Sequence, residues 1–399
     1  MRNGVVAMCV GITMCLSMAV CAKTASVDRP TQLIGYCELQ TNLPGGRFAN
    51  ISTMRACVVR ADGTGRRMLA NTLIKKPGSW TQFAGWSPDG KKAILLSAWE
   101  SAENATWEEE HKQFRQMDGA YLVDSCLMDL ASGKIFNPTA VERVSCYNTG
   151  LFFWPKDPNR FGFQAMIGDE SHPFSMNRDG TGKTDLSRGV GFTYGFSSSP
   201  DGKRVAYHKD YQLYVADADG SNPVKIETGN PFNFGPSWSP DGKWLLFVSG
   251  EHYNCHPFVV KSDGTGLRKI ADRGGYKGYT LILDVPDYHD GSSDGEIWSP
   301  DSKWIYYTAK VGESIELMRV SMDGKTEQLS KSAAGVSHYH PKLSPDGKWL
   351  LFGANKNGMR QLYVSRANGT DARPITRGRK GYASIFASWQ PKVAPATAK

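Results

Sequence analysis

The sequence predicts an all-β fold, a seven-bladed β-propeller, because two short motifs alternate along the chain. The first motif is Ser-Pro-Asp, in most copies preceded by Trp and followed by Gly and an apolar strand. Counting two degraded copies, it occurs seven times. The second motif ends a strand in Asp-Gly or a close relative, and it also occurs seven times. Four short strands in each repeat of roughly 40 to 45 residues form the pattern of a propeller blade.

Each motif has a physical reason to end one strand and begin the next. In the first motif, Pro fixes φ, Asp hydrogen-bonds its own turn and Gly accepts a positive φ. Asp-Gly in the second motif is a strong hairpin signal. A β-sandwich and a six-bladed ring are the alternative folds, and we disfavour both because two independent counts agree. The first motif begins at Trp86, Trp154, Ser199, Trp238, Trp298, Leu343 and Trp389, and the second at Asp62, Ser132, Asp179, Asp219, Asp263, Asp323 and Asn368.

The two ends of the repeat region indicate how the ring closes. The last copy of the first motif, at Trp389, has no strands after it, and the first unit, from Ile34 to Leu69, has no such motif before it. We therefore expect a C-terminal strand to complete blade 1, which removes the open edge of the ring. The propeller then spans residues 31–391, and residues 392–399 form a tail.

The N-terminus is typical of an exported protein. We interpret residues 1–22 as a cleaved signal peptide, since Arg2 precedes an apolar stretch that ends in small side chains. A lipid anchor on Cys21 is a minor alternative, and no later segment is suited to cross a bilayer. We expect a periplasmic or secreted protein. The net charge of +8 is spread along the chain, which indicates an acidic small molecule or polysaccharide rather than nucleic acid.

Five of the eight cysteines remain once the signal peptide is removed. An exported protein can form disulfides, but an odd number leaves at least one thiol without a partner inside the chain. Cys37 and Cys57 fall on adjacent strands of blade 1 and are plausible partners, although the sequence does not set their register. No Cys-x-x-Cys spacing occurs, so a structural zinc site of the finger type is not expected.

The repeat resembles that of the PD40 propellers of the Tol-B type. The resemblance rests on the paired Ser-Pro-Asp-Gly-Lys and Asp-Gly-Thr-Gly motifs and covers nearly all of the mature chain. It implies a propeller that binds envelope proteins or glycans without catalysis. Tol-B itself carries a separate N-terminal α/β domain and six blades, so the resemblance supports the fold more strongly than the function.

The chain is also similar to the oligogalacturonate lyases, seven-bladed propellers of about this length with a manganese site of histidines and a glutamine. The segment His338-Tyr339-His340-Pro341 resembles the metal-binding segment of those enzymes. The glutamine that they carry a few residues upstream is absent, since residues 335–337 are Gly-Val-Ser. The resemblance implies a divalent transition metal, with manganese as the first choice and its identity open.

All eight histidines are expected on one face of the ring. If the strands of a blade are lettered A to D from the axis outward, both motifs form turns on one face. The B–C loops and D–A crossings then lie on the opposite face, where each histidine falls. A histidine at a strand end is often only a hydrogen-bonded loop residue, but none of the fourteen motif turns contains one. The histidines are His111, His172, His208, His252, His256, His289, His338 and His340.

A metal site is predicted from four of these histidines, His256, His289, His338 and His340. Two of them, His338 and His340, are two positions apart on a strand, so we expect them to point to the same side and to converge near the axis. Neutral imidazoles in such a place suit Mn, Zn, Fe or Ni.

The favoured function is metal-assisted β-elimination of uronic-acid oligosaccharides, and the alternative is a non-enzymatic propeller that binds envelope proteins or glycans. Elimination removes a proton next to a carboxylate, so it needs a base and a cation that neutralises the carboxylate. We assign these catalytic roles to His208 and Arg188. The predicted substrate-binding residues, each of which could equally serve loop packing or solubility, are Arg47, Tyr194, His252, Tyr253 and Arg273.

Overall fold

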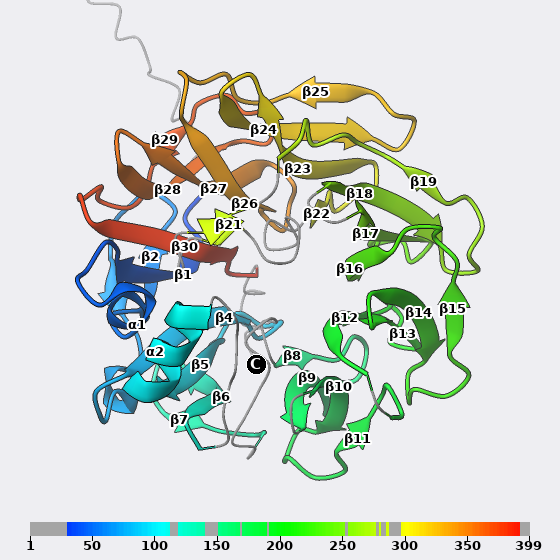
Figure 1. Cartoon of the computed structure of the whole chain (residues 1–399), viewed down its shortest axis with the longest axis horizontal. Coiled ribbons are helices and arrows are strands. Elements are labelled where there is room, and N and C mark those ends of the chain that lie inside the picture. The colour runs from blue at the N-terminus through cyan, green and yellow to red at the C-terminus, as the bar shows by residue number, and fades with distance from the viewer. Residues whose placement is uncertain are drawn as a thin grey trace, which may run out of the picture.

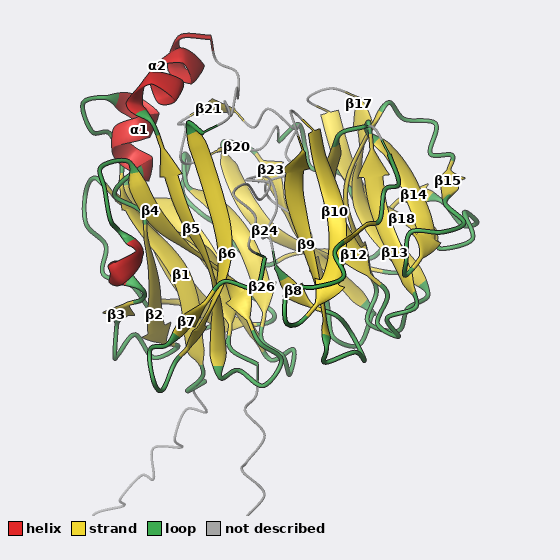
Figure 2. Ribbon diagram, turned by 90° about the horizontal axis from the view of Figure 1, so that it is seen from below, coloured by secondary structure: helices red, strands yellow, loops and turns green. Residues whose placement is uncertain are grey.

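The computed structural model describes residues 30–391 with several gaps, and its sheets stand around a common axis (Figure 1). In side view the strands run between two faces, and helices α1 (Gly46–Ile51) and α2 (Ala102–His111) lie together on one of them (Figure 2). None of the helices in the described part of the chain is long and apolar enough to cross a membrane. The expected signal peptide and tail lie outside the described residues. These are 30–111, 119–139, 151–167, 170–189, 191–251, 254–276, 279–280, 285–286 and 297–391.

Most strands form antiparallel units of four, whose first strand lies nearest the axis (Figure 1). Four of these units are separate sheets. Their strands are β4 (Ser79–Trp86), β5 (Lys92–Glu100), β6 (Tyr121–Asp129) and β7 (Ile135–Phe136); β8 (Phe152–Phe153), β9 (Arg160–Ile167), β10 (Glu170–Asn177) and β11 (Thr184–Asp185); β12 (Thr193–Ser198), β13 (Arg204–Lys209), β14 (Gln212–Asp217) and β15 (Val224–Ile226); and β16 (Phe232–Trp238), β17 (Trp244–Glu251), β18 (Asn254–Lys261) and β19 (Arg268–Lys269).

The remaining strands belong to a twelve-stranded sheet and a small ribbon. The ribbon is β20 (Tyr279–Thr280) with β21 (Val285–Pro286), and a short 3-10 helix, η1, spans Asn71–Leu73. In the large sheet the strands are β22 (Ile297–Trp298), β23 (Trp304–Val311), β24 (Ser314–Ser321) and β25 (Thr326–Gln328); β26 (Ser337–Leu343), β27 (Trp349–Lys356), β28 (Met359–Arg366) and β29 (Arg373–Pro374); and β30 (Tyr382–Trp389), β1 (Leu33–Gln40), β2 (Arg55–Arg60) and β3 (Arg67–Met68).

The last described strand of the chain pairs with the first. β30 runs antiparallel to β1, with partners from Ile34↔Trp389 to Gln40↔Tyr382. On its other side, β30 meets β28 through a single parallel pairing, Arg360↔Ala383. The N-terminal and C-terminal ends of the described chain therefore lie in one sheet, while the number of blades and the closure of the ring stay predictions.

The tryptophans of the first motif link neighbouring units. In four places the indole N–H donates a hydrogen bond to a backbone oxygen of an adjacent unit, with nitrogen–oxygen distances of 2.8–3.4 Å. A buried indole needs such a partner, so each bond fixes how closely two units pack. The donor and acceptor pairs are Trp86–Ser388, Trp154–Gly202, Trp298–Ser237 and Trp389–Lys342.

The turns of the two motifs are held by their own side chains. In the first motif, the Ser87 hydroxyl donates to Asp89 Oδ1 at 2.5 Å and accepts from the Lys92 N–H at 2.9 Å. In the second motif, the glycine allows close packing against the neighbouring unit. A Cβ at Gly220, whose φ is 81°, would lie 2.4 Å from the Leu186 carbonyl oxygen. A side chain at this position would push the turn away from the adjacent unit.

The sequence left a disulfide between Cys37 and Cys57 open, and the structure has both thiols free. Cys37 pairs with Ala56 across β1 and β2, whereas Cys57 pairs with Tyr36. Successive strand residues point to opposite faces, so the two thiols lie in different core clusters. The free and buried cysteines of the described chain are Cys37, Cys57, Cys126 and Cys255, and Cys146 lies outside it.

Burial makes these thiols poor nucleophiles, because it raises the pKa of both Cys57 and Cys126 to about 12. We predict that a Cys146→Ser variant of the mature protein shows almost no reaction with a thiol reagent at pH 8. After denaturation, four thiols should react. Rapid modification of the folded variant would contradict the buried, reduced state of these side chains.

Candidate functional site

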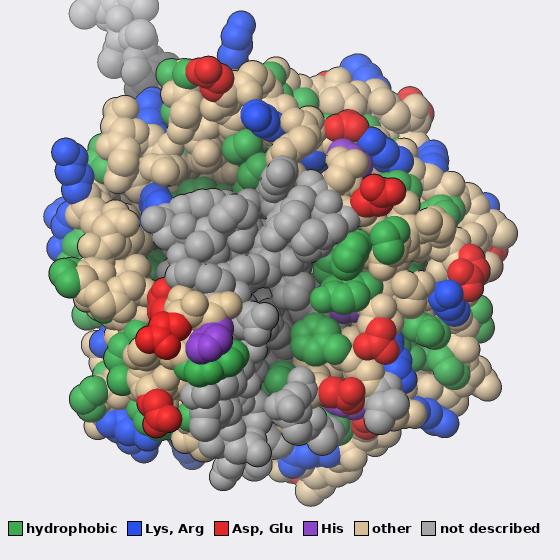
Figure 3. All heavy atoms as spheres, viewed as in Figure 1, with side chains coloured by type: hydrophobic (Ala, Val, Ile, Leu, Met, Phe, Trp, Pro, Cys, Tyr) green, Lys and Arg blue, Asp and Glu red, His purple; other side chains and the backbone are tan. Residues whose placement is uncertain are grey.

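Arg47, predicted to bind substrate, instead joins the two helices on their face of the ring. Its guanidinium contacts both carboxylate oxygens of Glu100 at 2.7 Å and one oxygen of Glu108 at 2.9 Å. The Asn104 amide donates to both glutamates. All four side chains are buried. Figure 3 shows further acidic side chains gathered over α2 on this face. The contacts of Arg47 therefore connect α1 to α2 and to the end of β5.

The helix network should be important for stability. We predict that Arg47→Met destabilises the protein by about 3–5 kcal/mol, because two buried carboxylates lose their partner. Adding Glu100→Gln should recover part of this loss. As a control, Arg66→Met removes a half-exposed ion pair with Glu38 and should cost no more than about 1 kcal/mol. Denaturant unfolding measures all three, and equal effects of Arg47→Met and Arg66→Met would refute the role of the network.

His208, the predicted base, and Arg273, the second cation predicted to bind substrate, are also buried and contact other residues of the protein. His208, on β13, is fully buried and packs against the rings of Tyr211 and Phe234. Arg273 is fully buried as well, and its guanidinium donates to the backbone oxygen of Thr308 at 3.1 Å and to its hydroxyl at 3.2 Å. In this conformation neither side chain is placed to contact a substrate.

The predicted catalytic Arg188 pairs with a residue of the neighbouring unit. Half of its side chain is exposed, and it contacts the backbone oxygen and the carboxylate of Asp219 at 3.4 and 3.5 Å. Asp219 belongs to a second-motif turn, so this contact connects Arg188 to the second-motif turn of the neighbouring unit. Tyr194 is on β12, but its side chain is not described. His252, Tyr253 and His289 lie outside the described residues.

His338 and His340 do not converge, which corrects the expectation from their spacing. The pairing of β26 with β27 shifts between Tyr339 and Lys342, and His340 has a φ of 49°. This bulge breaks the alternation on which the expectation depended. His338 contacts the Ile315 carbonyl in one neighbouring unit, whereas His340 stacks on Phe386 in the other.

Hydrogen bonds decide which of the predicted ligands could hold a metal. A carbonyl only accepts, so the 2.8 Å contact with Ile315 places a proton on His338 Nδ1 and leaves Nε2 as a donor atom for a metal. His256 is different, since its Nδ1 accepts the Arg273 N–H at 3.1 Å and the proton of a neutral ring then sits on Nε2. Burial lowers the pKa of His256, which favours this neutral form.

The described residues do not make a complete metal site. Among them, no three His, Cys, Asp or Glu side chains come together in a way that could hold an ion. Of the four predicted ligands, His338 fits the role and His256 does not. His340 stacks on Phe386, and His289 is outside the described chain. Manganese therefore stays a prediction.

Sequence reasoning missed a feature of the innermost strands. On four of these strands, one residue has a left-handed conformation with φ between 49° and 84°. In each case this residue lies four positions before the serine of the first motif, or before the glutamine that replaces the serine. A register shift occurs at each of these positions. The residues are Gly195 on β12, Gly235 on β16, His340 on β26 and Phe386 on β30.

Adjacent bulges meet around the axis. A Cβ on Gly195 would lie 3.3 Å from the Gly235 Cα. In the other pair, the rings of His340 and Phe386 stack with centroids 5.1 Å apart at 26°. A bulky residue in this conformation costs about 1–3 kcal/mol, and such strain is frequent at functional sites. Glycine avoids the strain, so the His340–Phe386 pair is the exception that needs an explanation.

Lys342 lies two residues beyond His340 on the same innermost strand. Its side chain is exposed to water, yet burial among the surrounding atoms lowers its pKa. A lysine that is both surrounded by protein and reached by water is expected where innermost strands face the axis of a ring. We call His340, Lys342 and Phe386 the axial cluster. It combines an imidazole, an ammonium group and an aromatic ring.

Comparison with solved structures identifies the architecture. An oligogalacturonate lyase from Vibrio parahaemolyticus matches with a TM-score of 0.54 and 14% identity, over 87% of this chain and 86% of that one. The fold is that of a β-propeller. An oligogalacturonate lyase in complex with manganese matches at 0.53 and 13% identity over 88% and 86% of the two chains. TolB from Acinetobacter baumannii matches at 0.51 and 13% identity, over 90% of this chain and 67% of that one.

These likenesses confirm the expected resemblance to both kinds of propeller, and at such identities they show the fold alone. No family model matches the chain. An uncharacterized protein of Agrobacterium fabrum is 26% identical over 115 residues, which are 29% of this chain and 35% of the relative. The match thus spans about a third of that relative's length, and it assigns no activity.

Proposed function

We propose that this protein is an exported, seven-bladed propeller that binds an acidic saccharide at the axis of its ring. The observation that carries the proposal is the axial cluster, in which two bulky residues keep a left-handed conformation where two other units have glycine. Lys342 lies two residues beyond His340 on β26, and burial lowers its pKa. We take the seven blades from the two repeated sequence motifs and the export signal from the apolar stretch within residues 1–22.

The chemistry of the cluster suits a sugar acid. An aromatic ring offers a flat apolar surface to the C–H face of a sugar, and an ammonium group pairs with a carboxylate. An anion next to Lys342 favours its charged form and so offsets the desolvation that lowers its pKa. Two structural neighbours are named oligogalacturonate lyases, and an oligogalacturonate is an acidic saccharide. Binding of an envelope protein is the alternative that the TolB likeness suggests.

Binding should depend on Lys342. We predict that uronate trimers bind the wild-type protein and that Lys342→Met weakens this binding about tenfold or more, because a hydrogen bond between charged groups contributes about 1.5–3 kcal/mol. The methyl-esterified trimers should bind poorly. Lys348→Met, which removes an exposed lysine from a turn of the same unit, is the control. Calorimetry measures each affinity, and a Lys342→Met protein that binds like wild type would overturn the proposal.

Glycine variants separate a binding role of the bulge from a structural one. His340→Gly relieves a left-handed strain of about 1–2 kcal/mol and loses a ring contact of about 0.5–1.5 kcal/mol, so its stability should change little. Phe386→Gly also loses the packing of the phenyl ring against the core and should be less stable. Affinity for the uronate trimer should nevertheless fall. Variants that unfold several degrees lower and keep their affinity would show that the rings serve only packing.

Elimination of bound uronates is a second candidate function, and the protonation of His338 Nδ1 is the observation that favours it. If His289 completes a site with His338, purified protein should contain a stoichiometric transition metal, and His338→Asn should lower that content. Polyuronate oligomers should then yield unsaturated products that absorb in the ultraviolet. Metal-free protein and a flat absorbance trace with every oligomer would rule out this candidate and leave saccharide binding in place.

A further inference from the structure

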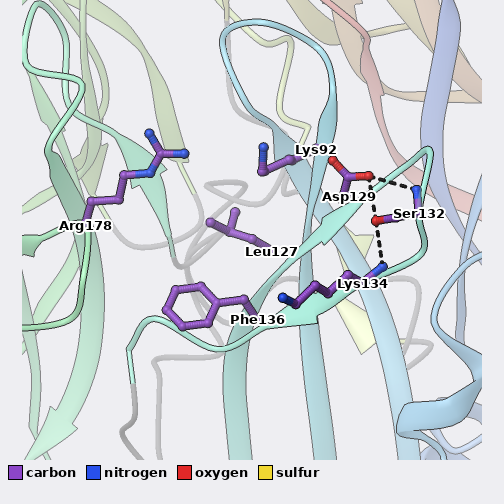
Figure 4. Close-up of a pocket in the computed structure, with 7 residues that line it drawn as sticks. All are labelled: Lys92, Leu127, Asp129, Ser132, Lys134, Phe136 and Arg178. Atoms are coloured by element: carbon purple, nitrogen blue, oxygen red, sulfur yellow. Dashed lines mark hydrogen bonds between the residues drawn. The ribbon is translucent and has the colours of Figure 1, made fainter.

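A pocket on the other face of the ring carries a second inference. It has a volume of about 350 Å³ and lies between the β4–β7 unit and the turn that follows β10 (Figure 4). Its walls include the end of β6 and β7, so it opens among the motif turns, opposite the helices. The lining residues are Lys92, Leu127, Asp129, Ser132, Lys134, Phe136 and Arg178.

The pocket has an excess of positive charge. Lys92, Lys134 and Arg178 line it, and no ion pair between residues of the described chain involves any of the three. The one carboxylate, Asp129, accepts hydrogen bonds from the backbone N–H and the hydroxyl of Ser132, both at 2.8 Å. These bonds lower the pKa of Asp129 and bind it to its own turn. Lys92 also attracts the Asp129 carboxylate, so Lys134 and Arg178 are the two cations that remain for an anion in the pocket.

One wall of the pocket is apolar. Phe136 pairs across the sheet with Leu127, which is buried, while half of the Phe136 side chain is exposed. Among the described residues it is the one aromatic side chain of the large exposed hydrophobic residues. An aromatic ring left open to water beside three cations forms a surface that a flat apolar group can cover.

Both unusual residues are departures from the repeat. The backbone N–H of Arg178 donates to Asn159, as the N–H of the equivalent residue does in other units. Those equivalent residues are Ala61, Leu130, Ala218, Met322 and Ala367. Ser262 has the same place before its Asp-Gly turn in the sequence. The repeat therefore needs no charge here. The turn itself does not require an arginine at position 178, so we relate Arg178 to the pocket that it lines.

The same holds for Phe136. It pairs with the residue two positions before the end of the preceding strand. The equivalent residues of the other units are Arg67, Thr184, Val224, Arg268, Glu327 and Arg373. None of them is aromatic. Two independent departures from the repeat, in two neighbouring units, thus line one pocket.

The fold holds the two residues in register. A Cβ on Gly180 would lie 2.6 Å from the Pro138 carbonyl oxygen, so the turn after Arg178 packs directly against the segment after Phe136. The pocket is therefore formed before any ligand arrives, and little order has to be gained on binding. Its volume falls within the range of small-molecule sites, roughly 300–1,000 Å³.

We infer that this pocket is a second binding site, separate from the axial cluster, for a small organic anion with a flat aromatic body. The cations would hold the anionic group, and Phe136 would stack on the ring. A simple inorganic anion would use the charges alone and would leave the phenyl wall without a role.

A fluorescent aryl carboxylate, coumarin-3-carboxylate, tests the site by anisotropy. The uncharged coumarin-3-carboxamide should bind about tenfold more weakly. Arg178→Ala and Phe136→Thr each install a residue that the repeat tolerates at that position, so both should fold normally and lose about tenfold in affinity. Arg67→Thr, which installs the same residue at the position equivalent to Phe136, is the matched control. Lys342→Met should also bind the probe normally.

The outcomes separate the site from general attraction to a basic surface. Loss of binding in Arg178→Ala and Phe136→Thr, with normal binding in Arg67→Thr and Lys342→Met, supports the inference. Equal binding of the carboxylate to all variants, equal binding of the carboxamide, or displacement by inorganic phosphate at concentrations similar to the probe would overturn it. So would an absence of binding to the wild-type protein at millimolar probe.

Discussion

The ring depends on the way in which one unit is fixed against the next. A tryptophan indole donates across the junction, and a glycine in the turn of one unit lets it pack directly on the backbone of its neighbour. Both contacts tolerate little change in distance, because a buried donor must keep its acceptor and closely packed backbone atoms cannot move nearer or apart without a clash or a gap. The units are therefore placed regularly, and each position in one unit has a structural counterpart in the others.

The fold was predictable because its signals are local. Each motif is a turn whose own side chains hold it, as Ser87 and Asp89 show, so a few adjacent residues suffice to place the strands. The disulfide was not predictable, since it depends on register between two strands. A shift of one residue in the pairing of β1 with β2 decides whether Cys37 and Cys57 face each other or opposite cores. Neither repeat motif fixes this register.

The candidate site was harder to predict, because loop side chains find partners far away in the chain. Arg47 was expected at a ligand and instead pairs with Glu100, 53 residues later. His338 and His340 have the spacing of neighbours on one side of a strand, but a bulge sends them toward different units. Glycine at Gly195 and Gly235 was the one signal that could have indicated the bulge beforehand. Comparison of equivalent positions in the units shows the bulge at His340 and Phe386 as well.

The pairing of β30 with β1 has a consequence for how the chain folds. The backbone N–H of Leu33 bonds the side chain of Gln390, 357 positions away. The first unit therefore stays incomplete until the final residues have been synthesised, and β1 keeps an unpaired edge in the meantime. Long-range pairing of this kind is slow, so the chain must spend time with that edge accessible. The first unit is complete only once β30 has paired with β1 as its innermost strand.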